Sequence, residues 1–250
     1  MRILGIIPAR YASTRFPGKP LALIGGLPMI QRVYAQAALT PELSGLIVAT
    51  DDIRIADAVR SFGGACLMTG DGHASGTDRC AEALLLSGGR YDAVVNIQGD
   101  EPFIRPGQIS HLCQLISAEG AEIATLAREI YDPTELNNPN LPKVVIGADG
   151  RALYFSRQAI PYLRGYPAEE WCDHHHYYKH IGIYAYRSEV LQKITALSPG
   201  RLEQAESLEQ LRWLENGYSI HTGITDSETI AVDTPDDLVA ACDFFNRQNG

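Results

Sequence analysis

Short, continuous apolar runs alternate with helix-like segments through the first hundred residues, and this rhythm limits the folds open to the chain. The apolar runs lie at residues 3–7, 46–50 and 93–98. The helix-like segments lie at residues 29–39, 53–62 and 78–86. Runs without polar alternation are typical of strands buried on both faces. Strands joined through helices imply right-handed crossovers, so we predict a Rossmann-like α/β fold: a mainly parallel sheet flanked by helices.

The rhythm changes after about residue 128, where strand-like signals come closer together. Residues 143–146 and 152–155 flank Gly-Ala-Asp-Gly, which predicts a β-hairpin. Residues 162–179 are rich in aromatic residues, proline and histidine and are interpreted as a loop, and residues 181–186 as a strand. We therefore expect one domain over residues 1–250, with a β-rich insertion at about 129–200.

Two helices are predicted in the last fifty residues. Leu208, Leu211 and Leu214 have helical spacing within residues 202–215, and Gly217 lies just past the expected end. Thr234-Pro235 has the chemistry of a helix start, with threonine as the N-cap and proline at the first helical position.

Charge and composition exclude several classes of partner. The formal net charge is −9, which argues against non-specific binding to nucleic acid or to an anionic membrane. Residues 1–7 are too short for a signal sequence, and no apolar stretch is long enough to span a membrane. The five cysteines are scattered, so we expect free thiols in a reducing cytosol. We expect a cytoplasmic protein without stable membrane association.

The loop after the first apolar run concentrates positive charge in an acidic chain. Residues 8–20 read PARYASTRFPGKP and contain Arg10, Arg15 and Lys19. In open α/β sheets, ligands bind at the carboxyl ends of the strands, where this loop emerges. Ser13, Thr14 and Gly18 leave backbone N–H groups approachable, so the loop is suited to a polyphosphate. The sequence contains neither GxxxxGK[ST] nor GxGxxG here, which disfavours ATPase and dinucleotide-binding functions.

Two carboxylates are candidate magnesium ligands. Asp100 comes after the apolar run at residues 93–98 and should reach the same sheet edge. Mg²⁺ prefers a few protein carboxylates together with phosphate oxygens. Asp100 could instead cap the helix near Pro106, although six residues separate them. For Asp233, a turn or capping role is as well supported as a metal role.

The chain resembles the 3-deoxy-manno-octulosonate (Kdo) cytidylyltransferases, a family of nucleotide-diphospho-sugar transferase type. The blocks that carry this resemblance occur in family order and cover nearly the whole chain. They are residues 8–21 (PARYASTRFPGKPL), 49–52 (ATDD), 75–79 (SGTDR), 95–102 (VNIQGDEP), 152–157 (ALYFSR), 180–184 (HIGIY), 206–212 (ESLEQLR) and 232–235 (VDTP). The first block alone indicates a sugar nucleotidyltransferase, and the later blocks narrow the resemblance to the Kdo branch.

The resemblance implies three groups of site residues. The nucleotide-binding group is Ala9, Arg10, Ser13, Arg15, Lys19, Ser75, Gly76 and Arg79. The sugar-binding group is Gln98, Arg157, His180, Tyr184, Glu209 and Gln210. Asp100 and Asp233 would bind Mg²⁺, and Arg10, Arg15, Lys19 and Asp100 would be catalytic. Without the resemblance, Arg157 would be interpreted as part of a surface ion pair and Tyr184 as core packing.

The implied reaction is CTP + Kdo → CMP-Kdo + diphosphate. The anomeric hydroxyl of the sugar would attack the α-phosphorus in line, and two Mg²⁺ ions would suit such a transfer. The product would feed lipopolysaccharide biosynthesis, and the family implies a homodimer. Related sugar acids of the 8-amino-Kdo or sialic-acid type remain alternatives as acceptors.

Two other functions fit the sequence less well. A nucleotide-sugar glycosyltransferase usually carries an Asp-x-Asp pair after a strand, whereas this chain has Gln98-Gly99-Asp100-Glu101. A non-catalytic nucleotide sensor would lack a catalytic group, yet Arg15, Lys19 and both aspartates are present. The run His174-His175-His176 suggests zinc, but consecutive side chains of an extended loop point in alternate directions.

Overall fold

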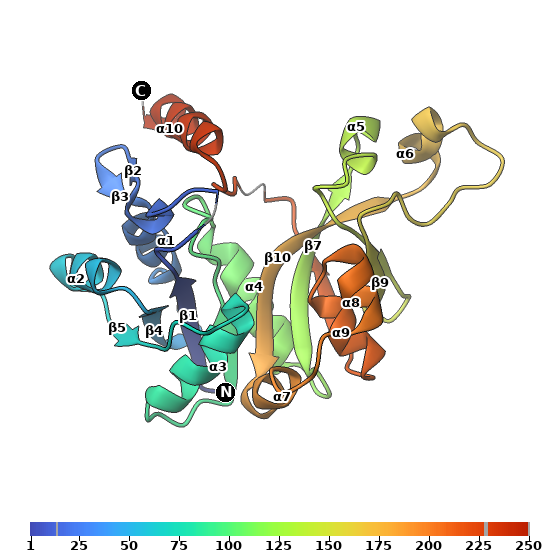
Figure 1. Cartoon of the computed structure of the whole chain (residues 1–250). Helices are drawn as coiled ribbons and strands as arrows, with labels where there is room; N and C mark the ends of the chain where they lie inside the picture. The colour runs from blue at the N-terminus through green and yellow to red at the C-terminus, as the bar shows by residue number, and fades with distance from the viewer. Residues whose placement is uncertain (14, 228–229, 250) are drawn as a thin grey trace. The chain divides into compact units, whose positions relative to one another are not determined.

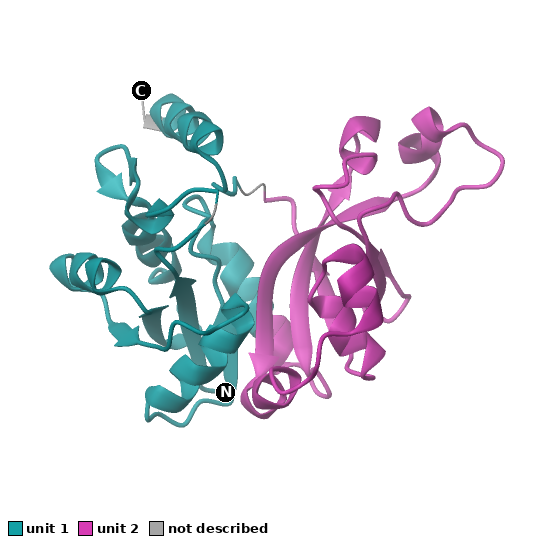
Figure 2. Ribbon diagram, in the orientation of Figure 1, with its two compact units in different colours: residues 1–113, 229–250 teal, residues 114–228 magenta. Residues whose placement is uncertain are grey.

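The computed structural model describes residues 1–13, 15–227 and 230–249 (Figure 1). Thr14 of the first loop therefore lies outside the described residues. The chain divides into two compact units, residues 1–113 with 229–250, and residues 114–228 (Figure 2). The second unit includes the region at about 129–200 that the sequence indicates as β-rich. The single-domain organisation stays a prediction.

The first unit is built on a parallel set of strands, as predicted. Its strands are β1 (Ile3–Ala9), β4 (Leu43–Thr50), β5 (Cys66–Met68) and β6 (Ala93–Asn96). They lie in the order β6-β1-β4-β5, and every pair is parallel. All four residues of β6 are buried, which explains why that run lacks polar alternation.

Helices connect these strands in the way the apolar rhythm predicts. They are α1 (Met29–Ala37), α2 (Ile53–Ser61) and α3 (Gly76–Leu86). Helix α4 (Pro106–Ser117) follows β6 and continues beyond residue 113, where the first segment of this unit ends. A 3-10 helix, η1 (Lys19–Leu21), and the pair β2 (Leu23–Ile24) and β3 (Leu27–Pro28) lie between β1 and α1. Asp52 caps α2, and Ser75 forms a capping box with Asp78 at the start of α3.

The chain returns to the first unit through its last helix, α10 (Pro235–Asn249). Thr234 precedes this helix as predicted. Val232 and Ala241 are buried in one apolar cluster with Ile24 and Met29. Burial of this cluster holds the returning segment beside the region after β1, although more than 200 residues separate them in sequence.

The described part of the second unit contains five strands. They are β7 (Ile123–Ile130), β8 (Lys143–Ile146), β9 (Ala152–Ser156), β10 (Tyr177–Arg187) and β11 (Ile220–Ile224). Strand β7 pairs antiparallel with β10 and parallel with β11. Strands β8 and β9 pair antiparallel, which confirms the predicted hairpin. The predicted α/β class is confirmed. The strands of the first unit pair in parallel, and those of the second unit show both parallel and antiparallel pairing.

The expected loop at residues 162–179 contains regular structure. It includes the 3-10 helix η2 (Ala168–Glu170), the short helix α6 (Trp171–His174) and the first residues of β10, which begins at Tyr177. The side chains of Trp171 and Tyr177 are buried with Ile130 and Leu136, at the end of α5 (Pro133–Leu136). The aromatic residues that suggested a loop therefore build a small core of their own.

The single helix predicted over residues 202–215 is wrong. Two helices occupy this segment, α8 (Arg201–Glu206) and α9 (Gln210–Glu215), after α7 (Ser188–Ile194). Ser207 breaks the helix because its backbone is left-handed, with φ of 51°. The N–H of Leu208 then reaches back to the carbonyl of Glu203 at 3.3 Å, as in a helix-terminating motif.

Two expectations concern the whole chain. All five cysteines, which lie within the described residues, are free thiols as predicted. Within the described ranges, no helix combines the length and apolar character needed to cross a bilayer.

We expect Ile6→Ala to lower the free energy of unfolding by about 2–5 kcal/mol, because the side chain is fully buried in β1 and its removal leaves a cavity. The matched control is Ile53→Ala, which truncates a side chain that is 56% exposed and should change stability by less than about 0.5 kcal/mol. Urea unfolding monitored by circular dichroism measures both. Equal losses in the two variants would contradict the assignment of β1 to the core.

Candidate active site

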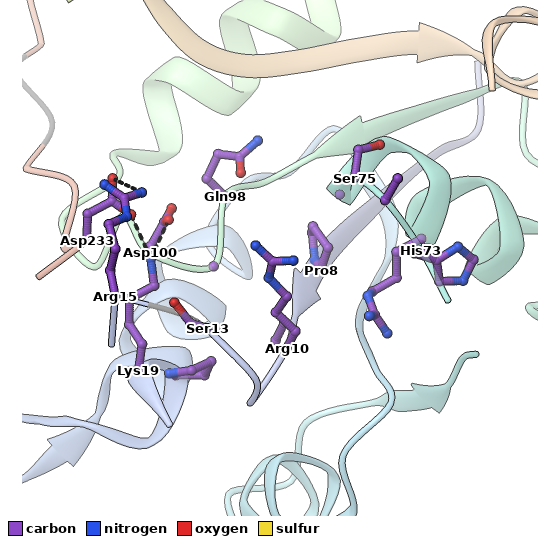
Figure 3. Close-up of a pocket in the computed structure, with 16 residues that line it drawn as sticks. Pro8, Arg10, Ser13, Arg15, Lys19, His73, Ser75, Gln98, Asp100 and Asp233 are labelled. Atoms are coloured by element: carbon purple, nitrogen blue, oxygen red, sulfur yellow. Dashed lines mark hydrogen bonds and ion pairs between the residues drawn. The ribbon is translucent and has the colours of Figure 1, made fainter. Parts of the chain in front are cut away.

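A pocket of about 450 Å³ opens in the first unit (Figure 3). Loops after β1 and β6, the segment before α3 and the segment before α10 form its walls. It gathers all described residues predicted for nucleotide and metal binding, together with one predicted for sugar binding: Ala9, Arg10, Ser13, Arg15, Lys19, Ser75, Gly76, Arg79, Gln98, Asp100 and Asp233. Four basic side chains thus face one pocket of an acidic protein.

Parallel pairing explains why these loops meet. Strand β1 pairs with β6 in parallel, so the chain leaves both strands at the same edge. Gly99 then passes close to the end of β1: a β-carbon at this position would lie 2.8 Å from the carbonyl oxygen of Pro8. Only glycine lets the two backbones approach in this way without displacement.

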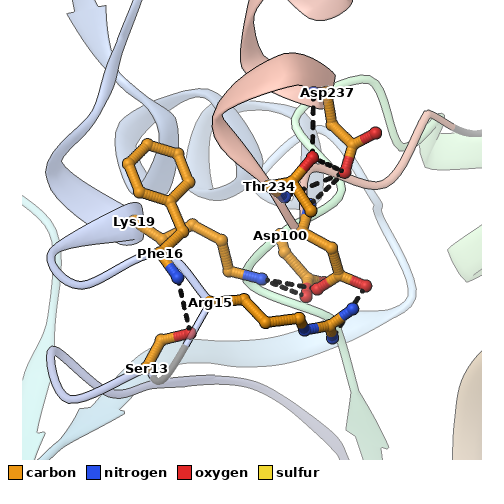
Figure 4. Close-up of polar contacts among 8 residues, drawn as sticks. Ser13, Arg15, Phe16, Lys19, Asp100, Thr234 and Asp237 are labelled. Carbon is orange, nitrogen blue, oxygen red and sulfur yellow. Dashed lines mark hydrogen bonds and ion pairs between the residues drawn. The ribbon is translucent and has the colours of Figure 1, made fainter.

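Lys19 connects the two predicted metal ligands. Its Nζ lies 2.8 Å from Asp100 Oδ2 and 3.0 Å from Asp233 Oδ1 (Figure 4). Arg15 Nη2 lies 3.1 Å from the other oxygen of Asp233. Two carboxylate oxygens therefore face one cation-sized position at the pocket wall. Within the described residues, no group of three or more His, Cys, Asp or Glu is placed to hold a metal. The two carboxylates of Asp100 and Asp233 fit Mg²⁺, which completes its coordination shell with phosphate and water oxygens.

The position of Asp233 depends on the backbone rather than on helix capping. The N–H of Val232 donates to the carbonyl of Asp100 at 2.9 Å, which brings the two segments together. Thr234 and Asp237 cap α10: Asp237 Oδ2 accepts the N–H groups of Asp233 and Thr234 at 3.0 and 2.9 Å. Capping therefore leaves the Asp233 carboxylate directed at Lys19 and Arg15.

The loop after β1 is closed by its own backbone. The carbonyl of Tyr11 accepts hydrogen bonds from the N–H groups of Ser13 at 3.0 Å and Gly18 at 2.9 Å. Gly18 has φ of +73°, a left-handed conformation that favours glycine. The guanidinium of Arg54 lies 3.3 Å from the centre of the Tyr11 ring. These contacts hold Arg10 and Ser13 at the pocket wall.

The opposite wall, before α3, is fixed by buried charge. The guanidinium of Arg79 donates to Thr69 Oγ1 at 2.6 Å and to the carbonyl of Gly70 at 3.2 Å, and it pairs with Asp51 at 3.2 Å. Only 4% of Arg79 is exposed. Arg79 thus lines the pocket and also anchors the segment at residues 69–75, which bears Ser75.

His73 is a lining residue that the sequence did not indicate. Its Nε2 contacts Glu82 Oε2, which also accepts the N–H of Gly70 at 2.9 Å. The hydrogen bond with His73 lowers the pKa of Glu82 from its ordinary value. The only signal in the sequence is that His73 lies two residues before Ser75, and a lone histidine near a motif carries no pattern of its own.

Glu101, next to Asp100, is also absent from the predicted site. Burial, with a smaller contribution from the charge of Asp100, raises the pKa of Glu101 to about 8. Its Oε2 has no hydrogen-bond partner among the described residues. At neutral pH the neutral form of Glu101 predominates, so the negative charge at this wall comes from Asp100 and Asp233.

Four of the predicted sugar-binding residues come together in the second unit. The rings of His180 and Tyr184, on β10, have centroids 5.3 Å apart, and Tyr184 packs against Trp213 of α9 at 5.1 Å. Burial and the nearby charge of Glu209 raise the pKa of Tyr184 well above its ordinary value. The hydroxyl of Tyr184 and Nε2 of Gln210 are buried without hydrogen-bond partners among the described residues.

His180 is held in its neutral form. Its Nε2 lies 3.0 Å from Thr125 Oγ1, and burial lowers the pKa of the imidazole to about 3. Gln98 also belongs to the predicted sugar-binding group. It lines the pocket of the first unit.

Arg157 has different partners from those predicted. Its guanidinium donates to three backbone carbonyls, those of Glu206 at 2.6 Å, Pro139 at 3.0 Å and Ser207 at 3.2 Å. Among the described residues, it does not form the surface ion pair that the residue type alone suggested. Its contact with a sugar carboxylate stays a prediction.

The three consecutive histidines have three different neighbours. The His174 ring stacks on Tyr166 at 3.9 Å, His175 packs edge-on against Tyr177 at 4.9 Å, and His176 contacts Glu129. The side chains diverge, as expected for adjacent residues of an extended segment.

Comparisons with known proteins agree with this geometry. The family model described as Cytidylyltransferase matches residues 4–223. The chain is 56% identical to the 3-deoxy-manno-octulosonate cytidylyltransferase of Parabacteroides distasonis, over 98% of each chain. It is 49% identical to the 8-amino-3,8-dideoxy-manno-octulosonate cytidylyltransferase of Shewanella pealeana, over 95% of this chain and 96% of the relative. A solved structure of CMP:2-keto-3-deoxy-manno-octonic acid synthetase complexed with CTP superposes with a TM-score of 0.92, at 42% identity, over 99% of this chain and 100% of the other.

The chain belongs to the cytidylyltransferase family. Within that family it groups with the 3-deoxy-manno-octulosonate cytidylyltransferases, which confirms the resemblance seen in the sequence. It is an enzyme of the nucleotidyltransferase class.

We expect Gly99→Ala to weaken CTP binding by roughly ten- to a hundredfold, because the new methyl group would push the loop after β6 away from Pro8. The control is Gly107→Ala, in which the same methyl group meets no atom within 4 Å. Calorimetric titration with CTP measures the affinity, and a thermal melt checks folding. Unchanged affinity in Gly99→Ala would show that this close approach does not shape the pocket.

We expect stability to fall as the pH decreases from about 6.5 toward 3, with a contribution of at most about 1.4 kcal/mol per pH unit from His180. The unfolded chain binds a proton on this imidazole near its ordinary pKa, whereas the folded chain resists protonation until about pH 3. His180→Gln should remove this part of the pH dependence. Equal slopes of unfolding free energy against pH for the two proteins would contradict the assigned pKa.

Proposed function

We propose that this enzyme transfers CMP from CTP to 3-deoxy-manno-octulosonate and releases diphosphate. The observation that carries the proposal is the meeting of Lys19 with Asp100 and Asp233 at the wall of a pocket lined by three more basic side chains. Membership of the 3-deoxy-manno-octulosonate cytidylyltransferase group supports the choice of nucleotide and acceptor.

The phosphates of CTP would lie against the loop after β1. Arg10, Arg15 and Lys19 lie within ten residues and face the pocket, so they can neutralise the charge of a triphosphate and of the departing diphosphate. The base and ribose would lie toward Ser75 and Gly76, on the wall that Arg79 anchors.

The transfer itself requires positioning more than covalent participation by the protein. The anomeric hydroxyl of the sugar releases its proton to solvent as its oxygen forms a bond to the α-phosphorus, and the bond from that phosphorus to the bridging oxygen of diphosphate breaks. Asp100 and Asp233 would hold Mg²⁺, which when bound supplies charge neutralisation and lowers the pKa of a coordinated hydroxyl group. Lys19, now between these carboxylates, can then turn its charge to the phosphates.

The sugar would be recognised by the polar groups of the second unit. The hydroxyl of Tyr184 and Nε2 of Gln210 are buried without partners among the described residues. Buried polar atoms normally have partners, so these two are suited to the hydroxyl groups of a ligand. Glu209 and neutral His180 lie beside Tyr184 and would complete this set.

A second candidate acceptor is 8-amino-Kdo, favoured by the relative from Shewanella pealeana. The identity to the Parabacteroides distasonis relative is higher, 56% against 49%, which favours Kdo. Competition between the two sugars in a single reaction would rank them directly.

We also propose the cellular setting that this reaction implies. The product would serve lipopolysaccharide assembly, and the CTP requirement with five free thiols suits the cytoplasm. A homodimer is proposed from family membership.

We expect diphosphate release only when CTP, Kdo and Mg²⁺ are all present, and loss of the activity on addition of EDTA. Asp100→Asn should lower kcat/KM by roughly a hundred- to a thousandfold, because the amide loses the charge that a divalent ion requires. The matched control is Asp57→Asn, an exposed aspartate on α2 that pairs only with Arg60 in the described contacts and should keep wild-type activity. Near-normal turnover by Asp100→Asn would refute the metal assignment. Release with another nucleotide but not with CTP would refute the proposed function.

A further inference from the structure

The segment between β5 and α3 forms one wall of the nucleotide pocket. Residues 73–76, just before α3 and at its first position, line the pocket. At the start of the segment, Thr69 Oγ1 and the carbonyl of Gly70 accept hydrogen bonds from Arg79 at 2.6 and 3.2 Å. At its end, Ser75 is fixed by the capping box of α3. The contacts of the residues in between therefore decide the shape of the wall.

One carboxylate on α3, that of Glu82, holds the middle of this segment at two points. Its Oε2 accepts the N–H of Gly70 at 2.9 Å and contacts Nε2 of His73. Asp71 and Gly72, which lie between these two points, are exposed. The turn from Gly70 to His73 is therefore fixed at both ends by the same group.

Charge strengthens this support. Glu82 and Arg79 lie three positions apart on α3, so they face the same side of the helix. The carboxylate binds the N–H of Gly70, and the guanidinium binds its carbonyl. The hydrogen bond with His73 lowers the pKa of Glu82, so this carboxylate is charged near neutral pH. Hydrogen bonds to a charged group are stronger than neutral ones, so the loss of Glu82 should loosen the segment.

The orientation of His73 suits support of the wall. Its ring points away from Arg10, and it contacts Glu82 of α3 (Figure 3). Ala74 and Ser75 follow directly in the chain, and both line the pocket. A displacement of His73 would therefore move the backbone of two further lining residues.

We propose that Glu82 is a positioning residue that acts through His73: the pair sets the wall at residues 73–76 and thereby the binding of the nucleoside half of the nucleotide. The phosphates would lie against the loop after β1, so the pair should affect nucleoside binding and leave phosphate binding almost unchanged. The place of the nucleoside at this wall rests on the proposed function, whereas the support of the wall by Glu82 does not.

The first test needs no ligand. Hydrogen exchange of the backbone amides at residues 70–77 is measured by mass spectrometry in the whole protein. Glu82→Ala and His73→Ala should each raise exchange there by about tenfold, because each breaks the contact that fixes the segment. The charge-matched control is Asp57→Ala, which removes an exposed carboxylate that pairs with Arg60 on α2 and should leave this exchange unchanged. Unchanged exchange in both test variants would overturn the proposal.

The second test separates the nucleoside half from the phosphate half. Calorimetric titrations compare CTP with inorganic triphosphate, which has no nucleoside. Glu82→Ala should weaken CTP binding by about tenfold and keep the affinity for triphosphate within about twofold, the size expected when one charge-assisted hydrogen bond no longer holds the wall. Asp57→Ala should change neither affinity. Equal losses for the two ligands in Glu82→Ala, or an unchanged affinity for CTP, would overturn the proposal.

A double-mutant cycle tests whether Glu82 acts through His73. The variant with both Glu82→Ala and His73→Ala should bind CTP no more weakly than Glu82→Ala alone, within about twofold, because both changes break the same contact. His73→Gln should recover most of the affinity lost in His73→Ala, since glutamine can place an N–H donor near the position of Nε2. Losses that multiply to about a hundredfold in the double variant, or no recovery in His73→Gln, would overturn the proposal.

Two further outcomes are distinguishable. If Glu82→Ala does not fold, as judged by circular dichroism, His73→Ala takes its place in the exchange and titration experiments, with His73→Gln as its conservative partner. If the wild type binds no CTP, the proposed function fails, while the exchange data still decide whether Glu82 and His73 support the wall.

Discussion

The contact of one ammonium group with two carboxylates ties the candidate active site together. Lys19 meets Asp100 and Asp233 across separations of 81 and 214 residues in sequence. The loop after β1, the loop after β6 and the segment before α10 thus converge at one point. Burial of Val232 and its hydrogen bond to Asp100 hold the returning chain there. Without that return, one of the two carboxylates would be missing from the pocket wall.

Charge is distributed so that the same pocket can accept a polyanion. The protein has a net charge of −9, yet four basic side chains face the pocket. Burial raises the pKa of Glu101 to about 8, which limits the negative charge beside Asp100 near neutral pH. The two aspartates are offset by Lys19 and Arg15 at distances of about 3 Å. The aspartates and the basic side chains stabilise one another. If either kind of group were removed, the other would be left at the pocket wall without a compensating charge.

The pocket could be predicted from the sequence because its parts are encoded locally. Continuous apolar runs specify parallel strands, and the loops after parallel strands must lie at one edge, so Lys19 and Asp100 are expected together. The break at Ser207 could not be predicted, because the leucine spacing is helical on both sides and tertiary contacts from Arg157 support the turn. His73 could not be identified for a related reason: its partner Glu82 is apparent only in three dimensions.

The two candidate binding regions are specified in different ways. Backbone geometry shapes the nucleotide pocket: Gly18 needs positive φ, Gly99 passes close to Pro8, and the carbonyl of Tyr11 closes the loop. Side-chain networks shape the candidate sugar region, where Arg157 and Glu206 contact the turn before Gln210. Backbone requirements tolerate few substitutions, whereas a side-chain network can be rearranged residue by residue. A side-chain network of this kind can accommodate different sugars, and one relative at 49% identity is named for an amino sugar acid.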